Sequence, residues 1–413
     1  MKNPPPRSLD NTCVESRIRA LLSTGAAPDI TYFWHEVESG VLPLITKSSS
    51  NAENREVTFL WRSEEPLQSV YVRLNRVTDK KDVKKGLMTR IPSTDIWILT
   101  LELPSSYRGS YSFIEIPSGM PSEAISQLGG RFSLLRGMPD PFNKASEINI
   151  RGFGESVLSL DLAPAQTEWD DTSRTSSGVL STSYSFIAGH RRRVRFHLPE
   201  IPVSDPLGLL VLPDAETWFD RIGITKAIDI AITNGRIKPI AILGIDNINE
   251  SDRVKILGGN KEIILDIAEN LIPQLYKDYT NIVWAGRSNT ILAGQSLGGV
   301  TALMAALYAS EIFGTVISHS PSMWWDPNRN TPVMFTENDS SWVSKQVLST
   351  PPKDVHIRLG VGSLEGATVP HVHQLHQSLL ATGVKSELSI YTGGHDYAWW
   401  RGAIIDGLTD MQS

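Results

Sequence analysis

The sequence has very little cysteine and lacks long apolar stretches. Cys13 is the single cysteine among 413 residues, so no internal disulfide can form, which is typical of proteins from a reducing compartment. The first ten residues, MKNPPPRSLD, lack the apolar segment of a secretory signal. No stretch approaches the ~20 apolar residues that a membrane span needs. We therefore expect a cytoplasmic protein that has no membrane partner.

The sequence also lacks the basic excess of a nucleic-acid-binding protein. Its formal net charge is −6, whereas such domains are usually strongly basic. The main basic cluster is Arg191, Arg192, Arg193 and Arg195, next to an apparent strand at 194–198. We expect these side chains to be solvated at the end of the strand, and we expect no nucleic-acid partner.

Length and hydrophobic pattern predict two domains. Domains of about 100 to 200 residues are usual, and 40% of this chain is hydrophobic. Residues 1–28 are polar, and between residues 56 and 116 short alternating segments such as EVTFLWR and GSYSFIEI are separated by turn residues, which predicts a β-sandwich at 29–160. Serine, threonine and aspartate then dominate, which indicates a linker at 161–180. The rest, 181–413, forms the second domain.

In the second domain, apolar strands alternate with helical patterns such as the one at 261–276. Such alternation indicates βαβ units and a mostly parallel sheet, and ligands bind such sheets beyond the carboxyl ends of the strands. The strands are expected at 207–212, 239–245, 290–294, 315–320, 355–361 and 387–391.

The stretch ILAGQSLGG, residues 291–299, holds the strongest motif. Gly294 to Gly298 spell Gly-x-Ser-x-Gly, the strand-to-helix turn that presents a nucleophilic serine in α/β-hydrolases. Such a pentapeptide can also be an ordinary glycine-rich turn. The apolar strand before it and the helical pattern after it favour the nucleophile, Ser296.

A serine nucleophile needs a base and a group that orients the base, and α/β-hydrolases place them in the order Ser, Asp or Glu, His. His395 follows the last strand in the loop YTGGHDYAWW, and Glu365 follows the strand before it. Three earlier histidines fall on one predicted helix as surface or flanking residues, without the cysteine or carboxylate partners that a metal site would need: His371, His373 and His376. We therefore predict His395 as the base, Glu365 as the acid, and no metal or cofactor.

An oxyanion hole normally uses the backbone N–H after the nucleophile and one from an earlier loop. The first would be Leu297. The second would come from the loop VLPDAETWFD, at Ala215 or Glu216.

These features together resemble the enterochelin (enterobactin) esterases. The resemblance covers nearly the whole chain beyond the first thirty residues, and it is carried by the stretches REVTFLWR, RLNRVTDK, PDAETWF, LGIDNIN, ILAGQSLGG, SHSPSMWW, VGSLEG and TGGHDYAWWRGA. It implies an N-terminal immunoglobulin-like sandwich, an α/β-hydrolase domain, Ser296 as nucleophile and His395 as base. The implied partner is a catecholate siderophore, free or as its ferric complex, and the chain looks close to the branch that accepts glucosylated enterobactin (salmochelin). It departs from the family at Ala215, where the family has glycine; alanine would be strained there if the position needs a positive φ.

A catecholate siderophore carries aromatic rings and, as the ferric complex, negative charges, so its site should offer aromatic faces and cations. Candidates expected in loops after strands are Trp218, Trp324, Trp325, Arg253 and Lys255. Two alternatives stay open: an aryl or feruloyl-type carboxylesterase, and a binding protein without activity in which the glycine-rich segment is only a turn. The sequence predicts no oligomeric state.

Overall fold

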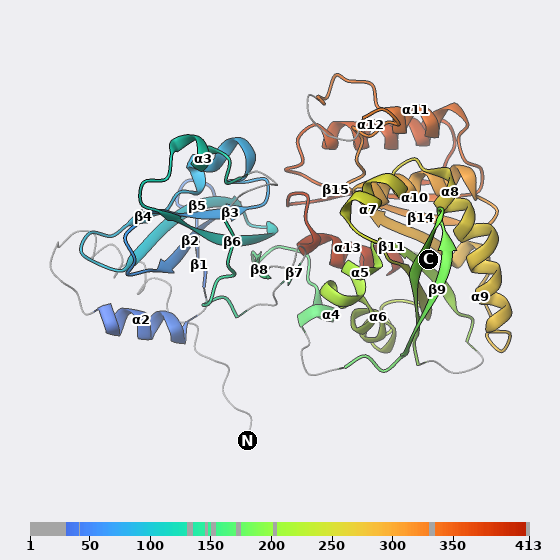
Figure 1. Cartoon of the computed structure of the whole chain (residues 1–413), viewed down its shortest axis with the longest axis horizontal. Helices are drawn as coiled ribbons and strands as arrows, with labels where there is room; N and C mark the ends of the chain where they lie inside the picture. Colours follow the sequence, from blue (N-terminus) through green and yellow to red (C-terminus); the bar gives the residue numbers. More distant parts are fainter. Residues whose placement is uncertain are drawn as a thin grey trace. The chain divides into compact units, whose positions relative to one another are not determined.

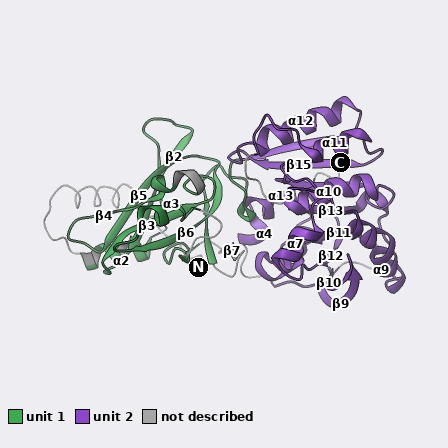
Figure 2. Ribbon diagram, turned by 45° about the horizontal axis from the view of Figure 1, so that its top comes forward, with its two compact units in different colours: residues 1–164, 392–398 green, residues 165–391, 399–413 purple. Residues whose placement is uncertain are grey.

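The computed structural model describes residues 30–40, 42–129, 135–144, 148–149, 154–170, 175–200, 205–329 and 335–409. The chain divides into two compact units (Figure 2). Unit 1 comprises residues 1–164 together with Thr392–Ala398, and unit 2 comprises residues 165–391 and 399–413. The division between Pro164 and Ala165 falls inside the predicted linker at 161–180, which also contains α4 (Thr167–Asp170) and the first residues of β9 (Val179–Ile187). The polar segment 1–28 lies outside the described residues.

Unit 1 contains two four-stranded antiparallel sheets. One has the order β1-β2-β5-β4 and the other β3-β6-β8-β7. The strands are β1 (Leu44–Lys47), β2 (Asn54–Arg62), β3 (Leu67–Leu74), β4 (Thr89–Arg90), β5 (Ile96–Pro104), β6 (Arg108–Pro117), β7 (Ile148–Asn149) and β8 (Gly154–Ser159). The helical segments are α2 (Ile30–Ser39), η1 (Lys80–Gly86) and α3 (Ser122–Ser126).

Aromatic side chains join the two sheets of unit 1. Val57, Phe59 and Trp61 alternate along β2 and are buried. From the other sheet, Tyr111 and Phe113 meet them: the Phe59 and Tyr111 ring centroids lie 5.1 Å apart, and those of Trp61 and Phe113 lie 4.8 Å apart. The alternation seen in the sequence therefore forms a shared aromatic core.

Unit 2 is built on an eight-stranded sheet with the order β16-β15-β14-β13-β11-β12-β10-β9. The six strands β16, β15, β14, β13, β11 and β12 pair in parallel with their neighbours. At the other edge, β10 pairs antiparallel with both β12 and β9. Besides β9, the strands are β10 (His190–Leu198), β11 (Gly208–Pro213), β12 (Ile240–Ile245), β13 (Thr290–Gln295), β14 (Thr315–His319), β15 (His356–Gly362) and β16 (Ser386–Tyr391). All six strands predicted for the parallel sheet are present within one or two residues of their expected bounds.

Helices lie on both faces of this sheet (Figure 1). Alternate residues of β11 show why: Leu209 and Val211 belong to the core cluster shared with α8, α10 and α12, whereas Leu210 and Leu212 are buried outside that cluster. The helices are α5 (Ala215–Thr217), η2 (Trp218–Ile222), α6 (Ile224–Thr233), α7 (Glu250–Ile256), α8 (Lys261–Leu265), η3 (Asp266–Leu271), α9 (Ile272–Asp278), η4 (Arg287–Asn289), α10 (Leu297–Tyr308), α11 (Trp342–Ser349), α12 (Thr368–Ala381) and α13 (Tyr397–Thr409). The predicted helix at 261–276 is formed by α8, η3 and α9. No helix in the described ranges has the length and hydropathy needed to cross a bilayer.

The prediction that the arginine cluster is solvated is wrong for two of its members. Arg192 is 1% exposed and forms an ion pair with Asp252, and Arg195 is 4% exposed and donates to Asp246 (Nε to Oδ1, 2.9 Å) and to Asp220. Acidic partners from distant segments neutralise both guanidinium groups, and this pairing is what allows charge to be buried.

Candidate active site at the Ser296 turn

Ser296 lies on a sharp turn between β13 and α10. Its backbone has φ 57° and ψ −119°, a conformation that L residues rarely adopt and that costs about 1–3 kcal/mol. Its N–H donates to the His319 carbonyl at 3.0 Å, and its carbonyl accepts from the N–H of Ser322 at 3.1 Å. These bonds hold the strained turn and leave Ser296 partly exposed among buried neighbours. The strand, turn and helix that the Gly-x-Ser-x-Gly motif predicts are thus present.

Two glycines near the serine, Gly294 of the motif and Gly299 just after it, allow close backbone contacts at the turn. A Cβ on Gly294 would collide with the carbonyl of Gly298, and a Cβ on Gly299 would lie 2.9 Å from the His319 carbonyl oxygen. Because the helix passes so close to β13 and β14, these positions have no room for a side chain.

The N-terminus of α10 lies directly after the serine. Leu297 is the first residue of α10, and the first N–H groups of a helix have no partner within the helix and attract negative charge. The Ser296 hydroxyl oxygen lies 3.2 Å from the hydroxyl oxygen of Ser322. This arrangement can stabilise an oxyanion that forms next to Ser296.

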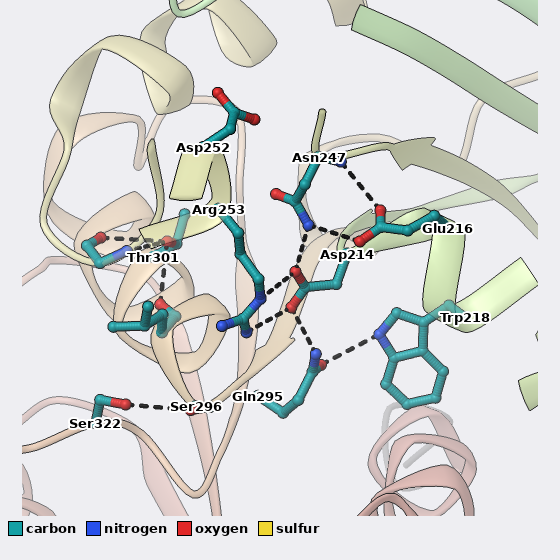
Figure 3. Close-up of polar contacts among 12 residues, drawn as sticks. Asp214, Glu216, Trp218, Asn247, Asp252, Arg253, Gln295, Ser296, Thr301 and Ser322 are labelled. Carbon is teal, nitrogen blue, oxygen red and sulfur yellow. Dashed lines mark hydrogen bonds and ion pairs between the residues drawn. The ribbon is translucent and has the colours of Figure 1, made fainter. Parts of the chain in front are cut away.

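The buried carboxylate of Asp214 connects the loop after β11 to this turn (Figure 3). Arg253 donates to it twice, from Nε to Oδ1 at 2.7 Å and from Nη2 to Oδ2 at 2.9 Å. Asn247 Nδ2 donates to Oδ1 at 2.6 Å, and Gln295 Nε2 donates to Oδ2 at 2.8 Å. Since Gln295 immediately precedes Ser296, Asp214 fixes the loop and the serine turn relative to each other.

Glu216 extends the same network. Its Oε1 accepts from Asn247 Nδ2 at 2.9 Å and its Oε2 from the N–H of Asn247 at 3.0 Å. Burial, and secondarily the negative charge of Asp214, raise the pKa of Glu216. Two carboxylates therefore share the donors of one asparagine.

Ala215 is not strained, although the sequence raised that concern. The positive φ of the loop falls on Asp214 (φ 59°, ψ 33°), and Ala215 is the first residue of α5. A Cβ on Gly244 of the neighbouring strand would lie 2.7 Å from the Ala215 Cβ, so the absent side chain at Gly244 makes room for the alanine. The positive φ thus falls one residue before the position at which the family has glycine.

The expectation that Trp218, Arg253 and Lys255 lie in loops is wrong. Trp218 begins the π-helical segment η2 and is 1% exposed, and its Nε1 donates to Gln295 Oε1 at 3.1 Å. Arg253 and Lys255 lie on α7; Arg253 is paired with Asp214, and Lys255 is exposed. The indole of Trp218 thus packs beneath the serine turn, inside unit 2.

Trp324 and Trp325 lie after β14, as expected, and both are partly buried. The ring of Trp325 lies against the backbone of Gly258, where a Cβ would come within 2.6 Å of it, and its centroid is 5.0 Å from that of Trp342. Both tryptophans pack against the core of unit 2, and they keep partly exposed aromatic surface.

Glu365 lies after β15, at the carboxyl end predicted for it. Its side chain is 2% exposed, and its Oε1 accepts from the Gly362 N–H at 2.7 Å and from the Ser320 hydroxyl. Ser320 in turn accepts from Trp400 Nε1 at 2.9 Å. This buried chain of hydrogen bonds holds the carboxylate in a fixed position.

His395 belongs to the segment Thr392–Ala398 of unit 1, and its side chain is partly exposed. The side chain of Asn75 binds the main chain of His395: Oδ1 accepts from the N–H at 3.0 Å, and Nδ2 donates to the carbonyl at 3.1 Å. The next residue, Asp396, accepts from the N–H groups of Ser110 at 2.6 Å and Ala398 at 2.8 Å, and burial raises its pKa to about 6.

Two other histidines of the C-terminal region, His371 and His376, have structural partners, whereas His373 is exposed as predicted. His371 was expected at the helix surface, but it is 4% exposed, stacks on Phe335 and bonds the Thr336 carbonyl through Nε2 at 2.9 Å. His376 Nδ1 lies 2.9 Å from Ser386 Oγ. Across the part of the chain that the structure describes, no group of histidine, cysteine and carboxylate side chains is arranged to hold a metal ion.

The supporting contacts of Asn75, Asp214 and Gln295 were missed in the sequence. All three lie inside stretches that carry the family resemblance, but each acts through a side-chain contact with a distant segment. Gln295 and Asp214, for example, are 81 positions apart. Nothing in the local pattern around either residue indicates that pairing.

Comparison with known proteins matches both parts of the chain. A family profile for the N-terminal domain of enterochelin esterases matches residues 56–169, and an esterase profile matches residues 185–411. The iron(III) salmochelin esterase of Escherichia coli O6:H1 is 57% identical over 96% of this chain and 97% of its own length. The iron(III) enterobactin esterase of Escherichia coli K12 is 30% identical, covering 87% of this chain and 92% of its own.

Solved structures agree over both units. The ferric enterobactin esterase of Salmonella typhimurium has a TM-score of 0.75 and 26% identity, with 89% of this chain and 95% of that chain covered. The enterobactin esterase of Shigella flexneri, solved in the presence of enterobactin, has a TM-score of 0.77 and 26% identity, with 94% and 98% covered. These matches support an α/β-hydrolase-like C-terminal domain that follows a separate N-terminal domain.

Proposed function

Because this chain belongs to the enterochelin esterase family, we propose that it is a cytoplasmic serine esterase that opens the trilactone ring of catecholate siderophores. Its substrates are salmochelin and enterobactin, free or as ferric complexes. The observation that carries the proposal is the strained Ser296 turn in a chain that is 57% identical, over nearly its full length, to a salmochelin esterase.

In the proposed reaction, Ser296 Oγ attacks an ester carbonyl of the ring while His395 takes the hydroxyl proton. Glu365 holds the imidazole in the productive tautomer and stabilises its charged form. The tetrahedral intermediate expels the alkoxide of the neighbouring serine unit, which takes the proton back from His395. Water, deprotonated by His395, then attacks the acyl carbonyl; the bond to Ser296 Oγ breaks, and His395 returns the proton to Oγ. Repeated cycles linearise the ring and cut it into shorter units.

The proposed oxyanion donors are the backbone N–H groups of Leu297 and Ala215. Leu297 supplies the first N–H of α10, and Ala215 supplies that of α5. The contacts of Asp214 support this assignment. Its carboxylate accepts a hydrogen bond from Gln295, the residue before Ser296, and Asp214 itself directly precedes Ala215. Preorganised donors of this kind typically contribute about 10²- to 10³-fold each to kcat.

Substrate contacts are proposed for Trp324, Trp325 and Lys255, whose partly or fully exposed side chains offer aromatic surface and a cation. The pairing of Arg253 with Asp214 neutralises much of its charge, so we assign it to the support of the loop. Trp218 supports Gln295 from beneath.

We also infer that the N-terminal domain is an immunoglobulin-like sandwich. If its strands are lettered A to G along the chain without β7, the sheet orders become A-B-E-D and C-F-G. This is the strand order of immunoglobulin constant-type domains.

Mass spectrometry of the products from salmochelin and enterobactin, each with and without iron, tests the substrate. The proposal expects linear and shorter fragments from the wild type and intact ring with Ser296→Ala. A general aryl or feruloyl esterase would instead cleave small aryl esters far faster than either siderophore. A binding protein would show no turnover that depends on Ser296.

A further inference from the structure

We propose that Asn75 is a positioning residue for the reaction, whose side-chain amide fixes the main chain of His395. The inference rests on the proposed function, since it gives Asn75 a catalytic consequence only if His395 is the base. Asn75 directly follows β3. It belongs to the same compact unit as the segment Thr392–Ala398.

The two hydrogen bonds run in opposite directions and engage both polar main-chain groups of His395. Oδ1 of Asn75 accepts from the His395 N–H at 3.0 Å, and Nδ2 donates to the His395 carbonyl at 3.1 Å. A primary amide offers a donor and an acceptor in one plane. Because both main-chain groups of His395 are held, the rotation of its backbone is restricted. The direction of its Cα–Cβ bond, and with it the placement of the imidazole, is therefore restricted as well.

The segment around His395 has the close approach that this contact requires. A Cβ on Gly394 would collide with Asn75 Oδ1 and would lie 2.7 Å from Arg76 Cγ. Glycine therefore lets the asparagine reach the main chain of the next residue.

Other bonds hold the segment on either side of His395. Arg108 N–H donates to the Thr392 carbonyl at 2.9 Å, the hydroxyl oxygens of Ser106 and Thr392 lie 2.7 Å apart, and Ser110 N–H donates to Asp396. With these bonds intact, loss of the Asn75 amide should loosen the residue that carries the imidazole and leave the rest of the segment attached.

We expect Asn75→Ala to lower kcat about tenfold to a hundredfold, since a displacement of about 1 Å in a reacting group can cost about 10²-fold. KM should change less than about twofold, because the amide bonds the protein's own main chain. Steady-state kinetics on a small aryl ester, and on the siderophore, measure both constants.

Ser48→Ala is the matched control. The Ser48 hydroxyl accepts from the N–H groups of Ser50 at 3.1 Å and Asn51 at 3.2 Å, and it donates to Glu102 at 2.8 Å. The variant therefore also loses side-chain hydrogen bonds to main chain, at the residue that directly follows β1 in unit 1. Its kcat should stay within about twofold of the wild type, with a loss of thermal stability similar to that of Asn75→Ala.

Asn75→Asp gives a pH signature that a purely structural role would not produce. Its ionised carboxylate has no donor for the His395 carbonyl, whereas the protonated acid has one O–H donor and one acceptor. The ratio of kcat in Asn75→Asp to kcat in the wild type should therefore rise as the pH is lowered from 8 to 4, because an aspartate side chain takes up its proton at about pH 4. Titration of His395 itself is common to both proteins and largely cancels in the ratio.

A kcat for Asn75→Ala that matches Ser48→Ala would overturn the inference. If Asn75→Ala does not fold, the nearly isosteric Asn75→Asp decides, and a ratio that stays flat between pH 8 and 4 would overturn the inference. Full turnover in Ser296→Ala or His395→Ala would refute the proposed function instead, whatever the Asn75 variants do.

Discussion

Replacing Arg253 with methionine tests whether this cation supports the serine turn or binds substrate. The change removes two charge-assisted hydrogen bonds, at 2.7 and 2.9 Å, from a carboxylate that is 1% exposed. Asp214 keeps the amide donors of Asn247 and Gln295 but loses its counter-charge. Breaking a buried ion pair by removing one partner costs about 3–5 kcal/mol. Because the Arg253 side chain is 18% exposed, we expect the lower end, about 3 kcal/mol.

Urea titration at neutral pH measures this loss as a shift in the unfolding midpoint of unit 2 at unchanged slope. Arg329→Met is the control, since Arg329 and Asp326 lie 3.8 Å apart and both are about one-third exposed; it should cost less than about 1 kcal/mol. Kinetically, Arg253→Met should lower kcat similarly for a neutral aryl ester and for the anionic ferric siderophore. A stability loss no larger than that of Arg329→Met, or a KM that rises for the ferric complex alone, would refute the supporting role and indicate direct charge recognition.

Three further predictions concern the proposed catalytic residues and their neighbours. Ser296→Ala and His395→Ala should each reduce trilactone hydrolysis by several orders of magnitude, because loss of one member disables the whole catalytic unit. The thermal midpoint should change little. Near-normal turnover in either variant would exclude the assignment. Glu365→Gln should lower kcat by up to about 10⁴-fold. Asp396→Asn should lower it less, because the carboxylate of Asp396 accepts hydrogen bonds from the N–H groups of Ser110 and Ala398. The reverse order of the two losses would show that Glu365 is not the acid. Burial raises the pKa of Asp396 from 3.8 to about 6, so the native state holds this proton more tightly than the unfolded chain, and the contribution of Asp396 to stability falls as the pH rises from about 4 to 6. Relative to the wild type, Asp396→Asn should therefore gain up to about 3 kcal/mol between pH 4 and pH 7 in chemical denaturation, and a difference that does not vary with pH would contradict the burial argument.

The fold was accessible from the sequence because its strands carry their own signal. A run such as PIAILGI is apolar throughout, as expected for a strand covered on both faces, and it forms β12 with all six residues buried. The Gly-x-Ser-x-Gly segment likewise specifies its own turn, since the glycines and the flanking strand and helix are local in sequence.

The supporting contacts of the site were not accessible in the same way. Arg192 looked solvated because its partner, Asp252, is 60 positions away. Asp214 and Arg253 are 39 positions apart, and Asn75 and His395 are 320 positions apart. Burial of a charge or an amide depends on partners that only the folded chain brings together, and hydrophobic periodicity contains no information about such pairs.

The interruption of unit 2 by Thr392–Ala398 has a consequence for how the protein can be divided. A cut near residue 164 separates Ser106, Arg108 and Ser110 from a segment that supplies their hydrogen-bond partners, so neither fragment is a self-sufficient module. A chimera that borrows the N-terminal domain of a relative must exchange residues 1–164 and 392–398 together. Truncation would remove the hydrogen-bond partners of Thr392–Ala398 together with the rest of the N-terminal domain. It would therefore not isolate what that domain itself contributes to activity.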